Sequence, residues 1–386
     1  MTLKETILIL FLKCNYSEEI NLFSRILHAL PEQTGALETH ARRGTSVRVS
    51  IAMCTYNGEK FLKEQLCSIA SQASLPDELV VCDDGSTDTT LPILRHYASS
   101  VAFPVRIYCN ASRLGFAKNF EQAISLTDGD IIVLSDQDDV WQKDKLQISV
   151  QALAEDHKAG YVFSDAIIID EMGEIIHHSL WEQVVFDQRR RGKFSLGPMD
   201  QVEVLLKGNV VTGATMALRA SLKAHVLPVA ELWKHDEWIA LVSSLCGARG
   251  IQIEKPLIQY RWHPAQAVGV RPPGVQFLLK RAWQSFTGNP QTYEANALAL
   301  RQWNASYTTL QRATSQAATL LPLLEAKVAH LALRAELYRR SRLTRLPVIV
   351  VELIRGGYHH HAAGSKSVLK DLLVPMLSNS HSAADT

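Results

Sequence analysis

The sequence has no long hydrophobic run, almost no net charge and no paired cysteine motif, and each absence excludes a class of protein. Its apolar runs at 7–12 and 346–354 are far shorter than the roughly 20 residues of a membrane-spanning helix, and no signal-peptide cleavage site follows the first. We therefore expect no transmembrane segment and a protein that stays in the cytoplasm. A net charge of only +1 argues against nucleic acid as a partner. Six scattered cysteines favour a reducing compartment over a disulfide framework.

Three common phosphate- and metal-binding motifs are also missing. No GxGxxG segment opens the first expected helix, so the dinucleotide fingerprint is absent. No phosphate-binding loop ends in Gly-Lys-Ser or Gly-Lys-Thr, which excludes a P-loop nucleotide site. No acidic segment has the spacing of an EF-hand calcium loop.

From Val47 on, the chain contains a regular alternation of two patterns. Runs rich in β-branched and apolar residues predict strands, and apolar residues at helical spacing, such as Leu62, Leu66 and Ile69, predict the helices between them. Strands are expected at 47–54, 78–82, 105–109, 130–135, 161–165, 214–219 and 255–263, and a late helix at 234–245. This alternation is typical of a parallel sheet with helices on both faces. The predicted fold class is therefore α/β, a Rossmann-like three-layer sandwich.

Composition divides the chain into three parts. Residues 1–46 form an N-terminal extension that ends in a polar linker, and residues 47–268 hold the α/β domain. Residues 269–386 are rich in Ala, Leu, Arg and Gln with almost no strand pattern, which predicts a helical C-terminal region and tail. Within it, the basic and apolar stretch 339–354 has two interpretations: a peripheral contact with an anionic membrane surface, or an amphipathic helix packed on the α/β domain.

Two acidic clusters, Asp83-Asp84 and Asp136-Gln137-Asp138, follow expected strands. In open parallel sheets, ligands bind at the carboxyl ends of the strands, where both clusters are expected. Residues two apart in an extended segment face the same way, and carboxylates so placed suit a hard divalent cation such as Mg²⁺ or Mn²⁺. Turn formation is the alternative, and we prefer it for Asp88 as a helix cap. It explains the two clusters together less well, because packed like charges cost stability unless a cation neutralises them.

Residues 47–263 resemble a family 2 glycosyltransferase with the GT-A fold. The motifs that carry the resemblance occur in the family's order: SIAMCTYNGEKFLKEQLCSIASQ, VVCDDGSTDTT, NASRLGFAKNFEQAI, LSDQDDVWQKDKL, GNVVTGATMAL, KHDEWIAL and YRWH. The form SDQDDVW, together with the HDxW pattern, is similar to bacterial rhamnosyltransferases of surface-polysaccharide assembly. The resemblance implies that 47–268 is a GT-A-type domain and that the protein is a metal-dependent glycosyltransferase.

The resemblance also implies the residues that bind a nucleoside-diphosphate sugar. The base and ribose would be lined by Thr55, Tyr56 and Asn57. Asp83 or Asp84 would accept a hydrogen bond from the pyrimidine N–H.

A second group is assigned to the sugar, the diphosphate and the metal. Asp136 would face the ribose or the sugar, and Asp138 would bind Mg²⁺ or Mn²⁺ across the diphosphate. His263, in YRWH, would reach the metal or the diphosphate. Arg113 and Lys118 could also meet the diphosphate or the sugar, and helix capping or surface pairing explains them equally well.

Asp236 is the candidate general base, because inverting transfer needs a carboxylate to take the proton of the acceptor hydroxyl. Its alternative role is a helix N-cap. Relatives carry an aromatic residue where this chain has Glu237, so the choice between the two acids stays open. Trp238 and Trp262 could stack on a sugar or nucleoside, but core packing is favoured. The run 359–361 is three histidines, which cannot readily converge on one ion and are expected at the surface.

The function implied is an inverting glycosyltransferase that acts on a polysaccharide or lipid-linked glycan acceptor, at the cytoplasmic face of the inner membrane if it contacts lipid. One candidate donor is dTDP-rhamnose. A nucleotidyltransferase is one alternative, although CTYNGEKF lacks the basic glycine-rich signature expected there. A catalytically silent nucleotide-sugar-binding scaffold is the other, and it would be expected to have lost one of the acids.

Overall fold

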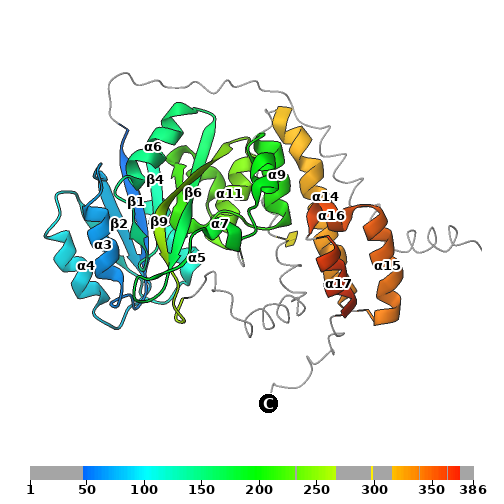
Figure 1. The fold of residues 1–386 in the computed structure, drawn as a ribbon, viewed down its shortest axis with the longest axis horizontal. Coiled ribbons are helices and arrows are strands. Elements are labelled where there is room, and N and C mark those ends of the chain that lie inside the picture. Colours follow the sequence, from blue (N-terminus) through cyan, green and yellow to red (C-terminus); the bar gives the residue numbers. More distant parts are fainter. Residues whose placement is uncertain are drawn as a thin grey trace, which may run out of the picture.

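The structure is a computed structural model that describes most of the α/β domain and of the C-terminal helices (Figure 1). The described residues are 47–230, 233–266, 297–298, 315–338, 340–362 and 364–373. The predicted N-terminal extension, residues 1–46, lies outside them, as do most of the segment that joins the two parts and the end of the tail.

Within the described residues, nine strands form one mixed sheet in the order β3-β2-β1-β4-β8-β6-β9-β5, with β7 paired to β6. The strands β1 to β4 are parallel to their neighbours, whereas β8 lies antiparallel between β4 and β6. The strands are β1 (Val49–Thr55), β2 (Glu78–Asp83), β3 (Val105–Cys109), β4 (Ile131–Ser135), β5 (Val140–Trp141), β6 (Ala159–Ile169), β7 (Ile175–His177), β8 (Met216–Arg219) and β9 (Arg249–Arg261). The carboxyl ends of β2 and β4 therefore lie on either side of the end of β1.

Helices cover both faces of this sheet, and the side-chain alternation of β1 shows why. Ala52 and Cys54 belong to one buried apolar cluster with α5, α9 and α11, whereas Ile51 and Met53 belong to a second with α3, α4 and α6. The helices of the domain are α3 (Leu62–Ala70), α4 (Thr90–Ala98), α5 (Phe116–Leu126), α6 (Lys145–Glu155), α7 (Leu180–Gln183), α8 (Gln188–Phe194), α9 (Pro198–Lys207), α10 (Lys223–Val226) and α11 (His235–Leu245). The predicted three-layer α/β sandwich is confirmed.

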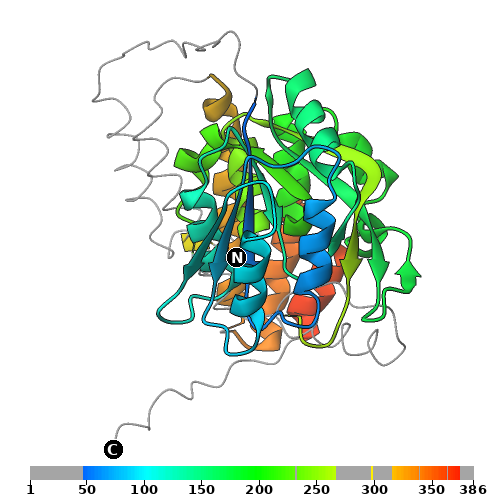
Figure 2. The ribbon, with the colours of Figure 1, turned by 90° about the vertical axis from the view of Figure 1, so that its left-hand side faces the viewer.

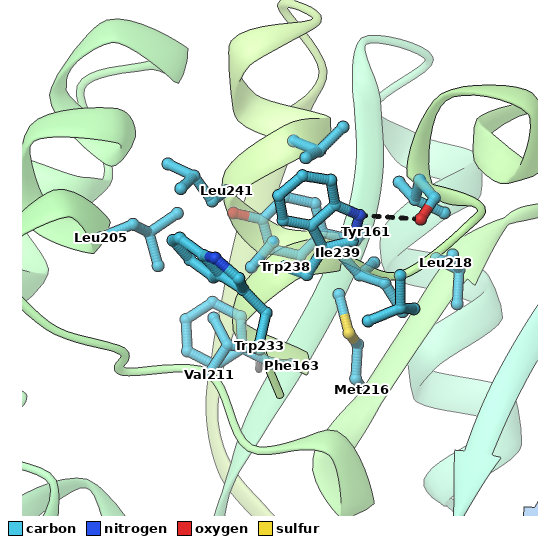
Figure 3. Packing of buried hydrophobic residues seen from close by; sticks show 14 of the residues in the cluster. Tyr161, Phe163, Leu205, Val211, Met216, Leu218, Trp233, Trp238, Ile239 and Leu241 are labelled. Atoms are coloured by element: carbon cyan, nitrogen blue, oxygen red, sulfur yellow. Dashed lines mark hydrogen bonds between the residues drawn. The ribbon is translucent and has the colours of Figure 1, made fainter. Parts of the chain in front are cut away.

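The first cluster also decides the role of Trp238. Figure 3 shows its indole packed among Trp233, Leu205 and Ile239. The side chain is 2% exposed, and its Nε1 donates to the backbone carbonyl of Val226 at 2.9 Å. Trp238 is therefore a core residue, as favoured from the sequence.

The described C-terminal part is helical, which confirms the predicted helical region. Its helices are α14 (Ser315–Leu337), α15 (Arg342–Ile354), α16 (Gly357–His361) and α17 (Ser365–Leu373). Figure 1 shows α14 and α16 beside α9, and they lie behind the α/β domain when viewed from its α3–α4 end (Figure 2). A buried ion pair holds the helices together, because Arg334 donates to both carboxylate oxygens of Asp371 at 2.7 and 2.8 Å. Among the helices described, none combines the length and apolar character needed to cross a bilayer.

Candidate functional site

The loop after β1 lies between the two acidic clusters and is hydrogen-bonded to both. Thr55 Oγ1 donates to Asp83 Oδ2 at 2.8 Å. The side chain of Gln137 bonds the backbone of Tyr56 twice, accepting from its N–H at 2.8 Å and donating to its carbonyl at 3.1 Å. A Cβ on Gly58 would lie 2.3 Å from Gln137 Oε1, so the approach of this amide depends on glycine at 58. Gln137 was part of the predicted cluster, but its role in holding this loop was not predicted.

Asn57 shapes the same loop through its backbone and its side chain. Its φ of 46° is left-handed, a conformation that Asn tolerates better than most residues. The amide of Asn57 donates to Ser86 Oγ at 2.8 Å, and its Oδ1 accepts from the amide of Thr87 at 2.9 Å. The loops that follow β1 and β2 are thus tied to each other.

The carboxylates of Asp83 and Asp84 are buried and serve different loops. Asp83 accepts from Thr55 and from both the amide and the hydroxyl of Ser86. Asp84 accepts from the side chain of Asn110 and from the amides of Leu114 and Gly115, at 2.7–3.0 Å. Asp84 therefore fixes the loop between β3 and α5.

That loop brings Arg113 against Tyr56, in the loop after β1. Its guanidinium carbon lies 3.9 Å from the centroid of the Tyr56 ring, and its Nε lies 3.9 Å from Asp84 Oδ2. The ring of Tyr56 is partly exposed, so the pair offers a flat cationic surface next to the first cluster. Lys118 instead pairs with Glu121 at 2.7 Å and donates to the carbonyl of Val229.

The acidic loop after β4 brings together carboxylates that repel one another. Asp138 Oδ2 lies 2.9 Å from His263 Nε2, which comes from the segment after β9. The pKa of Asp136 is raised to about 7, first by burial and then by the charges of Asp138 and Asp236, with Lys145 opposing the rise. The second cluster and the candidate base therefore act within one electrostatic environment.

Three further residues of this loop region were not predicted as site residues. Asp139 is 1% exposed, and burial, then the charges of Asp138 and Asp136, raise its pKa well above the usual range. Arg261 is the second residue. Its backbone amide donates to Asp139 Oδ1 at 2.9 Å, and the buried guanidinium of Arg261 donates to the backbone carbonyl of Asp138 at 2.9 Å. Lys145 is the third, and its charge opposes the raised pKa of Asp139. The last Asp of DQDD and the Arg of YRWH were visible signals in the sequence.

Asp236 lies in the first turn of α11. Its Oδ2 accepts from the amide of Gly213 at 3.1 Å, and its Oδ1 from the amide of Glu237 at 2.7 Å. The N-cap position belongs to Lys234, so the alternative role of Asp236 as the N-cap is wrong. Burial, and then the charge of Asp236, raise the pKa of Glu237.

The residues around Asp138 fit a divalent cation only as a partial ligand set. Asp138 and His263 offer an oxygen and a nitrogen side by side, and the raised pKa of Asp136 marks a lack of positive charge there. Among the described residues, no group of three or more His, Cys, Asp or Glu side chains is arranged to hold an ion alone. Ligands from a bound molecule would complete the shell, as Mg²⁺ usually requires.

The histidine run lies away from these acids, in α16. His359 and His360 are exposed, as predicted, but His361 is 9% exposed and packs near His330, with ring centroids 6.0 Å apart. The expected surface position is therefore wrong for His361, because α16 turns that side chain toward α14.

Comparisons with known proteins agree with the motifs. Residues 50–221 match the model of the family described as Glycosyl transferase family 2. A putative glycosyltransferase, EpsE of Bacillus subtilis, is 27% identical over 220 residues, which cover 55% of this chain and 73% of that protein. The dTDP-rhamnosyl transferase RfbG of Shigella flexneri is 39% identical over 105 residues, which cover 26% of this chain and 36% of that relative. The resemblance drawn from the motifs is confirmed.

Solved structures show only a distant likeness. TarS 1–349 of Staphylococcus aureus in complex with UDP-GlcNAc has a TM-score of 0.47 and 16% identity, covering 84% of this chain and 89% of that chain. A likeness at this level carries no weight for the function of this chain.

Proposed function

We propose that the protein is a metal-dependent, inverting glycosyltransferase that uses a nucleoside-diphosphate sugar, in keeping with the match of residues 50–221 to the family 2 model. The observation that carries this proposal is the convergence of Asp136, Asp138 and Asp236. The first two follow β4 and the third lies in α11, yet the charges of the other two raise the pKa of Asp136. A carboxylate for the cation, a second one beside it for the sugar and a separate general base in one site suit glycosyl transfer from a diphosphate.

The nucleoside end of the donor is assigned to the loops after β1, β2 and β3. A carboxylate has about four acceptor positions. Asp83 uses three of them, on Thr55 and Ser86, which leaves one for the N–H of a pyrimidine. Thr55, Tyr56 and Asn57 would line the base and ribose, and Arg113 would approach the diphosphate from its place over the Tyr56 ring.

Asp138 and His263 would hold Mg²⁺ or Mn²⁺, which would supply positive charge for the leaving diphosphate. Their contact at 2.9 Å places both donor atoms on one side of the acidic loop. Asp136 would face the ribose or the sugar. The guanidinium of Arg261 donates to the backbone carbonyl of Asp138. This bond would hold the backbone of Asp138 in place and so help to orient its carboxylate toward the cation.

Asp236 is the proposed general base. Two backbone amides orient its carboxylate, and the first turn of a helix is a favourable place for a negative charge. Burial raises the pKa of the neighbouring Glu237, which remains the alternative base. Asp236 would take the proton of the acceptor hydroxyl as that oxygen attacks the anomeric carbon from the face opposite the diphosphate.

The finer substrate assignment is a dTDP-sugar donor, with dTDP-rhamnose first, and a polysaccharide or lipid-linked glycan acceptor. The likeness to RfbG supports the donor. For a lipid-linked acceptor, α15 could rest on the cytoplasmic face of the membrane. Its residues Leu346, Val350 and Ile354 lie one helical turn apart and are 51%, 44% and 81% exposed.

The test is hydrolysis and transfer from a panel of UDP-, GDP- and dTDP-sugars with Mn²⁺. We expect turnover of at least one donor, its loss with EDTA and with Asp138→Ala, and retained donor binding with lost transfer in Asp236→Asn. Donor binding without turnover in the wild-type protein would favour the scaffold alternative. Full transfer by Asp236→Asn would show that the base is wrongly assigned.

A further inference from the structure

Lys145 is buried at the start of a helix, where both burial and the helix dipole oppose a cation. It is 1% exposed and is the first residue of α6, where the helix dipole and the free N–H groups place partial positive charge. Burial lowers the pKa of Lys145 to about 7, and the charges of Asp139 and Asp136 oppose that shift. The Trp141 ring adds a cation–π contact, with its centroid 4.3 Å from Nζ. A cation held at such cost needs a reason beyond filling space.

The hydrogen bond of this lysine goes to the turn that orients the proposed base. Lys145 Nζ donates to the backbone carbonyl of Ala214 at 2.6 Å. Ala214 lies in the 3-10 turn η1 (Gly213–Thr215), and the amide of Gly213 donates to Asp236 Oδ2. One ammonium group therefore bonds the turn that orients the proposed base, while its charge acts on Asp139 and Asp136 of the acidic loop after β4.

The turn has little room to adjust if this bond is lost. A Cβ on Gly213 would lie 2.5 Å from His235 Nε2 and 3.5 Å from the Cβ of Asp236. The backbone at 213 is therefore in close contact with the start of α11. A shift of the Ala214 carbonyl would move the Gly213 amide and, with it, the carboxylate of Asp236.

We propose that Lys145 is a positioning residue for glycosyl transfer, which sets the separation between the acidic loop after β4 and Asp236. The inference rests on the proposed function. Besides neutralising Asp139 and Asp136, the ammonium holds the 213–215 turn through its bond to the Ala214 carbonyl.

The test is Lys145→Met, which keeps the length of the side chain and removes its charge and its donors. We expect amide hydrogen exchange in 212–216 to become about tenfold faster, with exchange elsewhere unchanged. We expect kcat for transfer to fall about 10- to 100-fold, as for loss of a charged hydrogen bond, and the donor KM to change less than about threefold. The exchange measurement does not depend on turnover, so a wild-type protein without activity would defeat the proposed function and leave this inference testable.

Lys223→Met is the matched control, because Lys223 also donates to a backbone carbonyl, that of Thr127, on another part of the domain. It should leave exchange in 212–216 and kcat unchanged. If Lys145→Met does not fold, Asp139→Asn/Lys145→Met removes the unbalanced charge, and we expect it to show the same fast exchange and low kcat. Wild-type protection of 212–216 in either variant, or wild-type kcat in the double variant, would overturn the proposal and leave Lys145 as a counter-charge only.

Discussion

Replacing Gly58 by alanine should weaken binding of the nucleotide sugar, because the new methyl group displaces Gln137. A Cβ at position 58 would lie 2.3 Å from Oε1 and 2.6 Å from Cδ of Gln137, well inside contact distance. These are the far atoms of a flexible side chain, so Gln137 would rotate away while the backbone stays in place. The rotation would break both bonds that hold Tyr56, the one from its amide and the one to its carbonyl.

The size of the effect follows from those two bonds. A neutral hydrogen bond contributes about 0.5–1.5 kcal/mol, and both of these lie near solvent, which places them in the lower half of that range. Together they amount to about 1–2 kcal/mol of loop ordering, or about 5- to 30-fold in donor affinity. The rate of the chemical step should change much less, because Asp236 and the acids after β4 keep their contacts.

Titration calorimetry with the nucleotide sugar and the donor KM both measure this loss. Gly192→Ala is the matched control, since nothing lies within 4 Å of a Cβ at that position in α8, and alanine there should slightly stabilise the helix. Donor affinity within twofold of wild type in Gly58→Ala, in a protein that melts normally, would show that the Gln137 clamp does not order the donor loop.

Three further predictions concern charged side chains. Burial, followed by the charges of His330, Lys327 and His360, lowers the pKa of His361 to about 4, below its unfolded value near 6.5. Its contribution to stability is thus present above about pH 6.5 and lost as the pH falls toward 4; His361→Gln should flatten the fall in Tm over that range, whereas the same change at the exposed His359 should not. Arg334→Ala should cost about 3–5 kcal/mol in urea unfolding, because it leaves Asp371 buried without its cation, and a loss under about 1 kcal/mol would contradict the ion pair. Glu237→Gln should retain transfer within about tenfold, and complete loss of transfer would make Glu237 the base.

The parallel half of the sheet was predictable because its signals are local. The expected strands at 78–82, 105–109 and 130–135 agree within a residue with Glu78–Asp83, Val105–Cys109 and Ile131–Ser135. Each is an uninterrupted apolar or β-branched run between turn-forming residues, as buried parallel strands require. The same locality placed the acidic clusters at the ends of β2 and β4.

The other half of the sheet, in which most pairs are antiparallel, could not be derived in this way. The expected strand at 214–219 begins as the turn η1 and becomes β8 only at Met216, and the expected strand at 255–263 is the end of β9, which starts at Arg249. Pairing of β8 between β4 and β6 joins segments far apart in sequence, so no local pattern specifies it. The hydrogen bond between Arg261 and Asp139 joins residues 122 positions apart. The local sequence around either residue does not predict this contact.

The C-terminal helices, which composition marks as a separate region, are bonded to the α/β domain by a partly buried lysine. Lys327 of α14 donates to the carbonyls of Leu206 in α9 and His361 in α16. Burial, then the charge of Arg334, lower its pKa to about 8, and the charge of Glu237 opposes that shift. Glu237 in turn gains from this cation, which opposes the rise in its own pKa. The bonds of Lys327 join α14, α16 and α9, so the C-terminal helices pack on the α/β domain through their own side chains.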